Sequence, residues 1–181
     1  MESYIRFDRF IDLETSLEQL LAQIQGAPMT ATSWKWALIA AHSALQGAVC
    51  IALRGSAGFD TWKPKHFKKW LEAYENNEDL PDPQLDYFME LYDRLFGQEY
   101  GIDRDLIGWL NKSRNDFIHF NSDQFSIDRK SIVDAIDGSV SAMIAAPARS
   151  KGIFFYEEQQ TERFNALCQT IRERLKVLAV T

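Results

Sequence analysis

The sequence is poor in the residues that build covalent or metal frameworks, with two cysteines and three histidines in 181 residues. Nothing in the spacing of Cys50 and Cys168 suggests a disulfide framework or a zinc site. Cys50 lies in an apolar run and is expected to behave as a small buried hydrophobe. Asp116 and His119 have the spacing of a carboxylate-bridged metal helix, but no second acid-x-x-His pair accompanies them. We therefore predict neither a metal site nor a cofactor.

Other familiar features are also missing. The chain has no glycine-rich phosphate loop, no nucleophile elbow, no internal repeat and no low-complexity linker. Residues 1–10 include Arg6, Asp8 and Arg9 and contain no apolar signal core, so a reducing, cytoplasmic location is expected. The net charge of -6 and the pI of about 5.1 argue against a protein that coats nucleic acid through a broad basic face. They leave room for a small cleft that is locally basic.

What the sequence does contain is hydrophobic periodicity of the helical kind. With 46% hydrophobic residues, the chain can form one domain with a substantial core over residues 1–181. Apolar residues recur every three or four positions through most of it, and no alternating strand pattern lasts. The sequence predicts an all-α, single-domain helical bundle with long core helices and a short helical insertion after the second helix, at about residues 55–83. The predicted helices are 7–25, 33–54, a short one beginning at Pro64, 83–96, 103–120, 128–146 and 157–177.

The second of these helices is apolar nearly all round. Ser33 is its predicted N-cap. Because the apolar stretch from residue 34 to 53 also carries Lys35, His42, Ser43 and Gln46, we interpret it as a central core helix and not as a membrane span. Two of these polar residues, His42 and Gln46, are four apart and need partners inside a core. They either support a functional site on a neighbouring helix or form an ordinary satisfied core pair.

The predicted helix 103–120 carries the most informative segment. Its apolar positions include Leu110, Phe117 and Ile118, and Arg114 falls in the same row. A guanidinium on the inward face of a helix stays charged, so it requires an anion or strong acceptors nearby. His119 follows five residues later, and histidine is the side chain best suited to proton transfer near neutral pH. An arginine that holds a phosphate and a histidine that moves a proton are the minimum parts of a metal-independent ribonuclease site.

An ideal helix does not aim these two side chains at one point. Residues five apart are rotated by about 140° from each other, whereas Asn115 and His119, four apart, share a face. Either the helix ends near His119, where residues 121–123 have loop composition, or a second copy of the protein completes the pocket. The arginine side chain is also long enough to bend part of the way.

Residues 114–119, Arg-Asn-Asp-Phe-Ile-His, resemble the R-x4-6-H motif of the HEPN superfamily, the all-helical nucleotide-binding and ribonuclease domains of toxin–antitoxin and phage-defence systems. The polar Asn115 directly after the arginine fits a further habit of that family. The resemblance covers one helix by motif and the chain by its helical architecture. Family members with a nucleotidyltransferase partner often carry a modified tyrosine two residues after the histidine. Asn121 stands there in this chain, which puts that form of regulation in doubt.

The resemblance implies a helical homodimer with the two motif helices close together, and RNA cleavage without a metal to a 2′,3′-cyclic phosphate. His119 would act as general base or acid on the ribose 2′-hydroxyl, and Arg114 would hold the scissile phosphate and its developing charge. Asn115 would orient the histidine or the phosphate. RNA or a nucleotide is the expected ligand, and an antitoxin protein is a possible partner.

Basic residues elsewhere could assist RNA binding. Lys112, Arg129 and Lys130 are close enough in sequence to enrich a cleft near the motif. A second group interleaves basic and aromatic residues, a pattern that can hold RNA by charge and stacking. Its alternative interpretation is a solvated amphipathic helix whose aromatic side chains pack inward. This second group comprises Lys63, Lys65, His66, Lys68 and Lys69 with Trp62, Phe67 and Trp70.

Three hypotheses therefore stand at the level of sequence. The first is a metal-independent endoribonuclease of a toxin or defence system. The second is a non-catalytic HEPN-like dimer that binds nucleotides or a protein, which the acidic charge favours somewhat. The third is a purely structural bundle in which Arg114 ties helices together and His119 caps a helix C-terminus.

Overall fold

The fold is given by a computed structural model, which describes residues 4–26, 29–55, 58–97, 103–119 and 123–180. Within these segments the chain is helical almost throughout, and β-type pairing is limited to one isolated antiparallel bridge between Trp62 and Leu85. The predicted all-α, single-domain bundle is confirmed. The α-helices are α1 (Arg9–Gln25), α2 (Ala31–Leu53), α3 (Pro64–Glu75), α4 (Phe88–Phe96), α5 (Arg104–His119), α6 (Arg129–Ala145) and α7 (Glu158–Val180), and the short 3-10 helices are η1 (Phe59–Thr61) and η2 (Pro147–Arg149).

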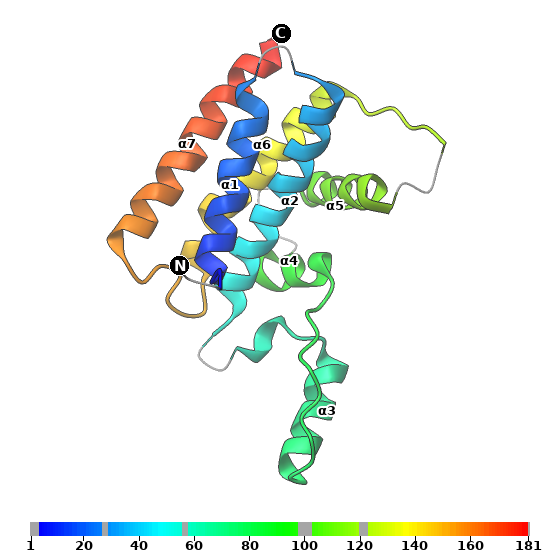
Figure 1. The fold of residues 1–181 in the computed structure, drawn as a ribbon, viewed down its shortest axis with the longest axis vertical. Helices are drawn as coiled ribbons and strands as arrows, with labels where there is room; N and C mark the ends of the chain where they lie inside the picture. Colours follow the sequence, from blue (N-terminus) through cyan, green and yellow to red (C-terminus); the bar gives the residue numbers. More distant parts are fainter. Residues whose placement is uncertain (1–3, 27–28, 56–57, 98–102, 120–122, 181) are drawn as a thin grey trace.

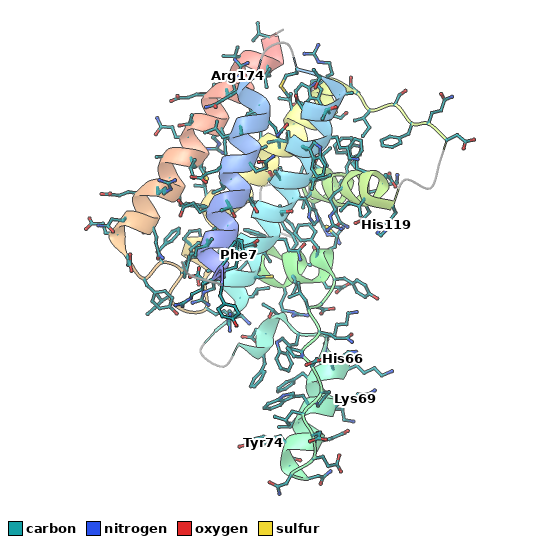
Figure 2. All side chains as sticks on the ribbon, in the orientation of Figure 1. Phe7, His66, Lys69, Tyr74, His119 and Arg174 are labelled. Atoms are coloured by element: carbon teal, nitrogen blue, oxygen red, sulfur yellow. The ribbon has the colours of Figure 1, made fainter. Side chains whose placement is uncertain are left out.

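Side-chain caps fix where three of the long helices begin. The Asp8 carboxylate accepts the backbone N–H groups of residues 10 and 11, and Asp128 caps α6 in the same way. α2 begins two residues earlier than predicted, because the Thr30 hydroxyl is its N-cap and accepts the N–H of Ser33. The predicted N-cap, Ser33, therefore lies within the first turn. At the other end of α1, Arg174 donates to the Ile24 carbonyl from α7 (labelled in Figure 2).

The core lies between four long helices. α1, α2, α6 and α7 run side by side, and α4 and α5 pack on the far side of α2 from α1 (Figure 1). α2 packs against α1, α4, α5 and α6 and is the most buried element. Alanines at Ala37, Ala41, Ala44 and Ala48 are fully buried along it, so the neighbouring helices approach its backbone closely. Gly47 contributes to this, because a Cβ there would lie 3.8 Å from the Leu13 Cα on α1.

By length and composition alone, α2 could cross a membrane. However, 67% of its most apolar window is buried inside the bundle, as expected of a core helix. Burial against α1, α5 and α6 accounts for its composition without a membrane, since a helix that is apolar all round needs apolar neighbours on every side.

α5 leaves the bundle at an angle. Its first half is anchored by the fully buried Ile107 and Leu110, which pack against α2 and α6. Its second half extends outward, and His119 lies at the outer end (Figure 2). The predicted apolar row is thus buried only in part: Phe117 is half-buried against Phe125, and Ile118 is 47% exposed instead of inward-facing. The predicted last residue of this helix, Phe120, lies outside the described residues.

The insertion after α2 forms an arm that projects from the end of the bundle (Figure 1). We use "the arm" for residues 59–86, which comprise η1, α3 and the extended segment that returns to α4. Pro64 begins α3 as predicted, and the Glu78 N–H bonds to the Ala73 carbonyl as the chain reverses. Phe59, Trp62, Phe67 and Trp70 pack their rings against one another, with centroids 5.0–6.0 Å apart in neighbouring pairs.

The predicted helix 83–96 was wrong in its first turn. α4 begins at Phe88, and the preceding residues are extended because they pair with the other side of the arm. The Gln84 carbonyl accepts the Lys63 N–H, and the Asp86 N–H donates to the Thr61 carbonyl, both at 2.9 Å. Leu85, expected to be buried, is consequently exposed. Tertiary pairing outweighs the local preference of Asp82-Pro83 for a helix start.

Candidate functional site

The arginine singled out by the sequence is half-buried on α5. Its Nη1 donates to the Oδ1 of the adjacent Asn115 at 2.9 Å, so the two residues of the motif hold each other. The Nε of Arg114 is buried and has no hydrogen-bond partner in the described part of the chain. A buried donor without a partner costs about 1–3 kcal/mol, so Arg114 is not satisfied by the protein alone.

A second polar pair lies beside it. His42 on α2 is 1% exposed, and its Nε2 is 2.9 Å from the Oδ1 of Asn111 on α5. An amide oxygen only accepts, so Nε2 carries the proton and the buried Nδ1 keeps a lone pair without a donor among the described residues. Asn111, four residues before Asn115 on the same helix face, was not predicted. Its position one turn before Asn115 was the available signal, because it puts a second amide on the inward face of the helix, where it can pair with the inward histidine of α2.

The electrostatics of His42 link the two pairs. Burial lowers the pKa of His42 to about 4, the hydrogen bond to Asn111 opposes this, and the positive charge of Arg114 lowers it further. His42 is therefore neutral at physiological pH and unsuited to carrying a proton to solvent. We call His42, Asn111, Arg114 and Asn115 the α2–α5 polar cluster. His42 thus contacts the motif helix through Asn111, and its role as support for a site or as a core pair stays open.

The remaining predicted site residues lie apart from this cluster. α5 is helical without interruption to His119, which is its last residue and is exposed. With about 100° of rotation and 1.5 Å of rise per residue, His119 points about 140° away from Arg114 and lies about 7.5 Å further along the axis. The helix thus does not end early enough to turn His119 back. Gln46 on α2 is half-buried, and no hydrogen bond joins its side chain to α5 in the described segments.

The basic residues predicted to assist RNA binding are engaged locally. Lys112 and Lys130 form exposed ion pairs with the residues one turn later, Asp116 and Asp134. Arg129, at the start of α6, lies 5.8 Å from the ring centre of Trp34. Exposed pairs of this kind contribute at most about 1 kcal/mol, so an RNA phosphate could displace them. In the arm, the aromatic side chains pack inward while Lys65, Lys68 and Lys69 face solvent, in agreement with a solvated amphipathic helix.

The described residues contain no group of three or more histidine, cysteine, aspartate or glutamate side chains arranged to hold a metal ion. Cys50 is half-buried and Cys168 is buried. Burial raises the pKa of their thiols to about 11 and about 12 respectively, so both are poor nucleophiles at neutral pH.

Comparisons with family models, with curated proteins and with solved structures find no match to this chain.

Proposed function

We propose that this protein is a metal-independent endoribonuclease of the HEPN type, acting as a homodimer in a toxin or phage-defence system. The observation that carries the proposal is the incompletely satisfied guanidinium of Arg114, fixed by Asn115 on a helix that projects from the bundle. A phosphodiester would supply strong acceptors to the guanidinium, and it would reach the covered Nε after a shift of the arginine side chain. We place the protein in the cytoplasm, with RNA as its ligand. An antitoxin protein is proposed as its second partner.

The residues of α5 would divide the reaction between them. His119 removes the proton of the ribose 2′-hydroxyl, the 2′-oxygen attacks phosphorus, and the bond to the 5′-oxygen breaks. The 5′-oxygen takes up a proton from water as it leaves, which yields a 2′,3′-cyclic phosphate. Arg114 stabilises the charge that develops on the phosphate oxygens. Asn115 holds the guanidinium in place. His42 and Asn111 are positioning residues, because they fix the α2 side of the motif helix and stay neutral.

A second copy of the chain is part of the proposal. Since α5 is continuous, Arg114 and His119 of one protomer diverge, and a site with both groups is formed more simply from the arginine of one protomer and the histidine of its partner. Residues on the projecting, solvent-facing half of α5 would then meet across the two-fold axis.

The direct test is cleavage of a labelled RNA in EDTA. Arg114→Ala and His119→Ala should each lower the cleavage rate by about 100-fold or more, the range expected on losing a positioned acid–base or charge-stabilising group. His66→Ala, on the arm, is the matched control and should retain full activity. A substrate with 2′-deoxyribose at the cleaved position should resist the wild-type protein. The proposal fails if either α5 variant cuts RNA as fast as wild type.

Mixing the two inactive variants tests the shared site. After subunit exchange, half of the dimers pair an Arg114→Ala chain with a His119→Ala chain, and each such dimer has one intact composite site. Activity should therefore recover to about a quarter of the wild-type value. Mixed samples that stay inactive, although mass measurement shows exchanged dimers, would contradict a site built across the interface.

A non-catalytic binding module is the second candidate. The pairing of Lys112 and Lys130 with aspartates, together with the net charge of -6, leaves little free positive charge near the motif. This candidate predicts no cleavage at any protein concentration, together with a higher melting temperature in the presence of a nucleotide or protein ligand. Arg114→Ala should abolish that thermal shift. If Arg114→Ala instead destabilises the free protein by several kcal/mol, the arginine is a structural tie.

A further inference from the structure

A cleft at another end of the molecule gathers positive charge in an otherwise acidic protein. The start of α1, the end of α2 and the loop before α7 meet there (Figure 1). The cleft has a volume of about 500 Å³, and Arg9, Arg54, Lys151 and Tyr156 contribute to its walls. A neighbouring hollow of about 350 Å³ shares both arginines and extends to Trp62 and Leu85 at the base of the arm.

Backbone geometry holds the cationic residues together. The Lys151 N–H and the Ser150 hydroxyl both donate to the Ala52 carbonyl, which ties the loop to the end of α2. Gly55 has a φ of +45°, a conformation that favours glycine, and a Cβ on Gly152 would lie 3.8 Å from the Gly55 Cα. Arg54 and Lys151 are therefore brought to one cleft by a close approach of two backbone segments almost 100 residues apart.

Carboxylates neutralise this charge only in part. Within the described segments no ion pair joins Arg54 or Arg9 to an acidic residue, and Arg9 donates instead to the phenol oxygen of Tyr156 at 2.7 Å. Lys151 lies 3.5 Å from Asp60, and both side chains are about half exposed, at 47% and 49%. The nearby Asp8 carboxylate accepts the N–H groups of residues 10 and 11, and the hydrogen bond from Ile11, that from Phe10 and the charges of Arg6 and Arg9 lower its pKa. It therefore offsets part of the positive charge of Arg9.

The partial negative charge at the C-terminal end of α2 does not neutralise these cations either. Its partial negative charge resides on the last carbonyls. Those of Ile51 and Ala52 already accept backbone and hydroxyl donors from Arg54, Lys151 and Ser150. Arg54 lines both hollows without an acidic partner among the described residues, whereas Arg9 lines both but already donates to Tyr156 and lies over its ring. The positive charges of the two arginines add within the cleft.

We propose that this cleft binds a ligand that carries two or more linked phosphate groups. Arginine forks match phosphate oxygens, and two arginines with a lysine suit a charge above that of one phosphate. The volume exceeds the size of a single phosphate, and the neighbouring hollow beside Trp62 can take an apolar or planar remainder. The site is separate from the α2–α5 polar cluster, and it does not depend on the proposed nuclease activity.

Isothermal titration of the full chain with tripolyphosphate and with ATP, at low ionic strength and without divalent cations, tests the proposal. We expect both to bind, and Arg54→Gln and Arg9→Gln each to weaken binding at least tenfold, while adenosine gives no signal. Lys68→Gln, an equal charge change on the exposed face of α3, is the matched control and should leave the affinity within twofold. A higher affinity for ATP than for tripolyphosphate would assign the nucleoside to the hollow beside Trp62, and equal affinities would assign the site to the phosphates alone.

A variant that should gain affinity guards against simple loss of folding. Asp60→Asn removes the carboxylate that competes for Lys151, so tripolyphosphate should bind several-fold more tightly. Three results would overturn the proposal: no binding of either probe, an equal loss in Lys68→Gln, or unchanged binding in Arg54→Gln and Arg9→Gln. Failure here leaves RNA cleavage untouched, because that assay depends on α5.

Discussion

The bundle and the arm bury apolar side chains in different ways. In the bundle, α2 is enclosed by α1, α4, α5 and α6, and its interior residues reach zero exposure over five turns. In the arm, no bundle helix lies alongside α3, and only Thr61 and Ala73 are buried. A few aromatic rings pack locally there, while Tyr74 stacks on Trp70 and stays 61% exposed. The difference teaches that one short chain can contain a cooperative core and a locally stabilised projection.

The largest effect should come from a cavity in the bundle. Leu45→Ala removes a fully buried side chain from α2 and should lower the free energy of unfolding by about 3 kcal/mol. Leu71→Ala on α3, where the leucine is 39% exposed, is the matched control and should cost less than about 1 kcal/mol. Urea denaturation of both variants gives the two values. Equal losses would show that the arm belongs to the same cooperative core.

Lowering the pH should reduce the free energy of unfolding through His42 in the bundle and not through His66 in the arm. The pKa of His42 is near 4 in the folded chain and 6.5 in the unfolded chain, so between these values the unfolded state binds the proton more readily. Stability is then complete above pH 6.5, falls as the pH is lowered towards 4, and loses about 3 kcal/mol from this residue. Unfolding measured across this range should lose that slope in His42→Gln. The same substitution at His66, on α3, should leave it in place.

The smallest global effect should come from the aromatic cluster of the arm. Trp70→Ala removes a large ring but should change the free energy of unfolding by less than about 1 kcal/mol. The ring cluster touches α2 through η1, but α3 has no comparable contact with a bundle helix among the described residues, so opening should stay within the arm. Hydrogen exchange followed by mass spectrometry should show faster exchange in residues 64–75 and unchanged exchange in α2. Faster exchange across the whole bundle would contradict the separation of the two regions.

The predictability of the fold follows the same division. Helices α1, α2, α6 and α7 could be placed to within a few residues because their apolar spacing and buried stripes coincide, as at Leu13, Leu17 and Leu20. The start of α4 could not be predicted. Its sequence favours a helix near Asp82, and what prevents one is pairing with residues 61–63, a contact made only once the arm has folded.

The candidate sites divide in a similar way. Arg114 and His42 were identifiable because a charged or polar side chain interrupts an apolar row. The rotation of His119 away from Arg114 could be calculated from helix geometry, but where α5 ends could not. The cleft formed by Arg9, Arg54 and Lys151 had no sequence pattern at all, since these residues are separated along the chain and are assembled by helix packing.

The uninterrupted course of α5 has a consequence for dosage. Under the proposed arrangement, a lone protomer holds half of each reaction centre, so turnover per molecule declines on dilution below the dissociation constant of the dimer. Well below that threshold, total turnover rises with the square of the protein level. A cell could then tolerate a trace of the protein, and a partner that covers the outer half of α5 would silence two centres by occupying one surface.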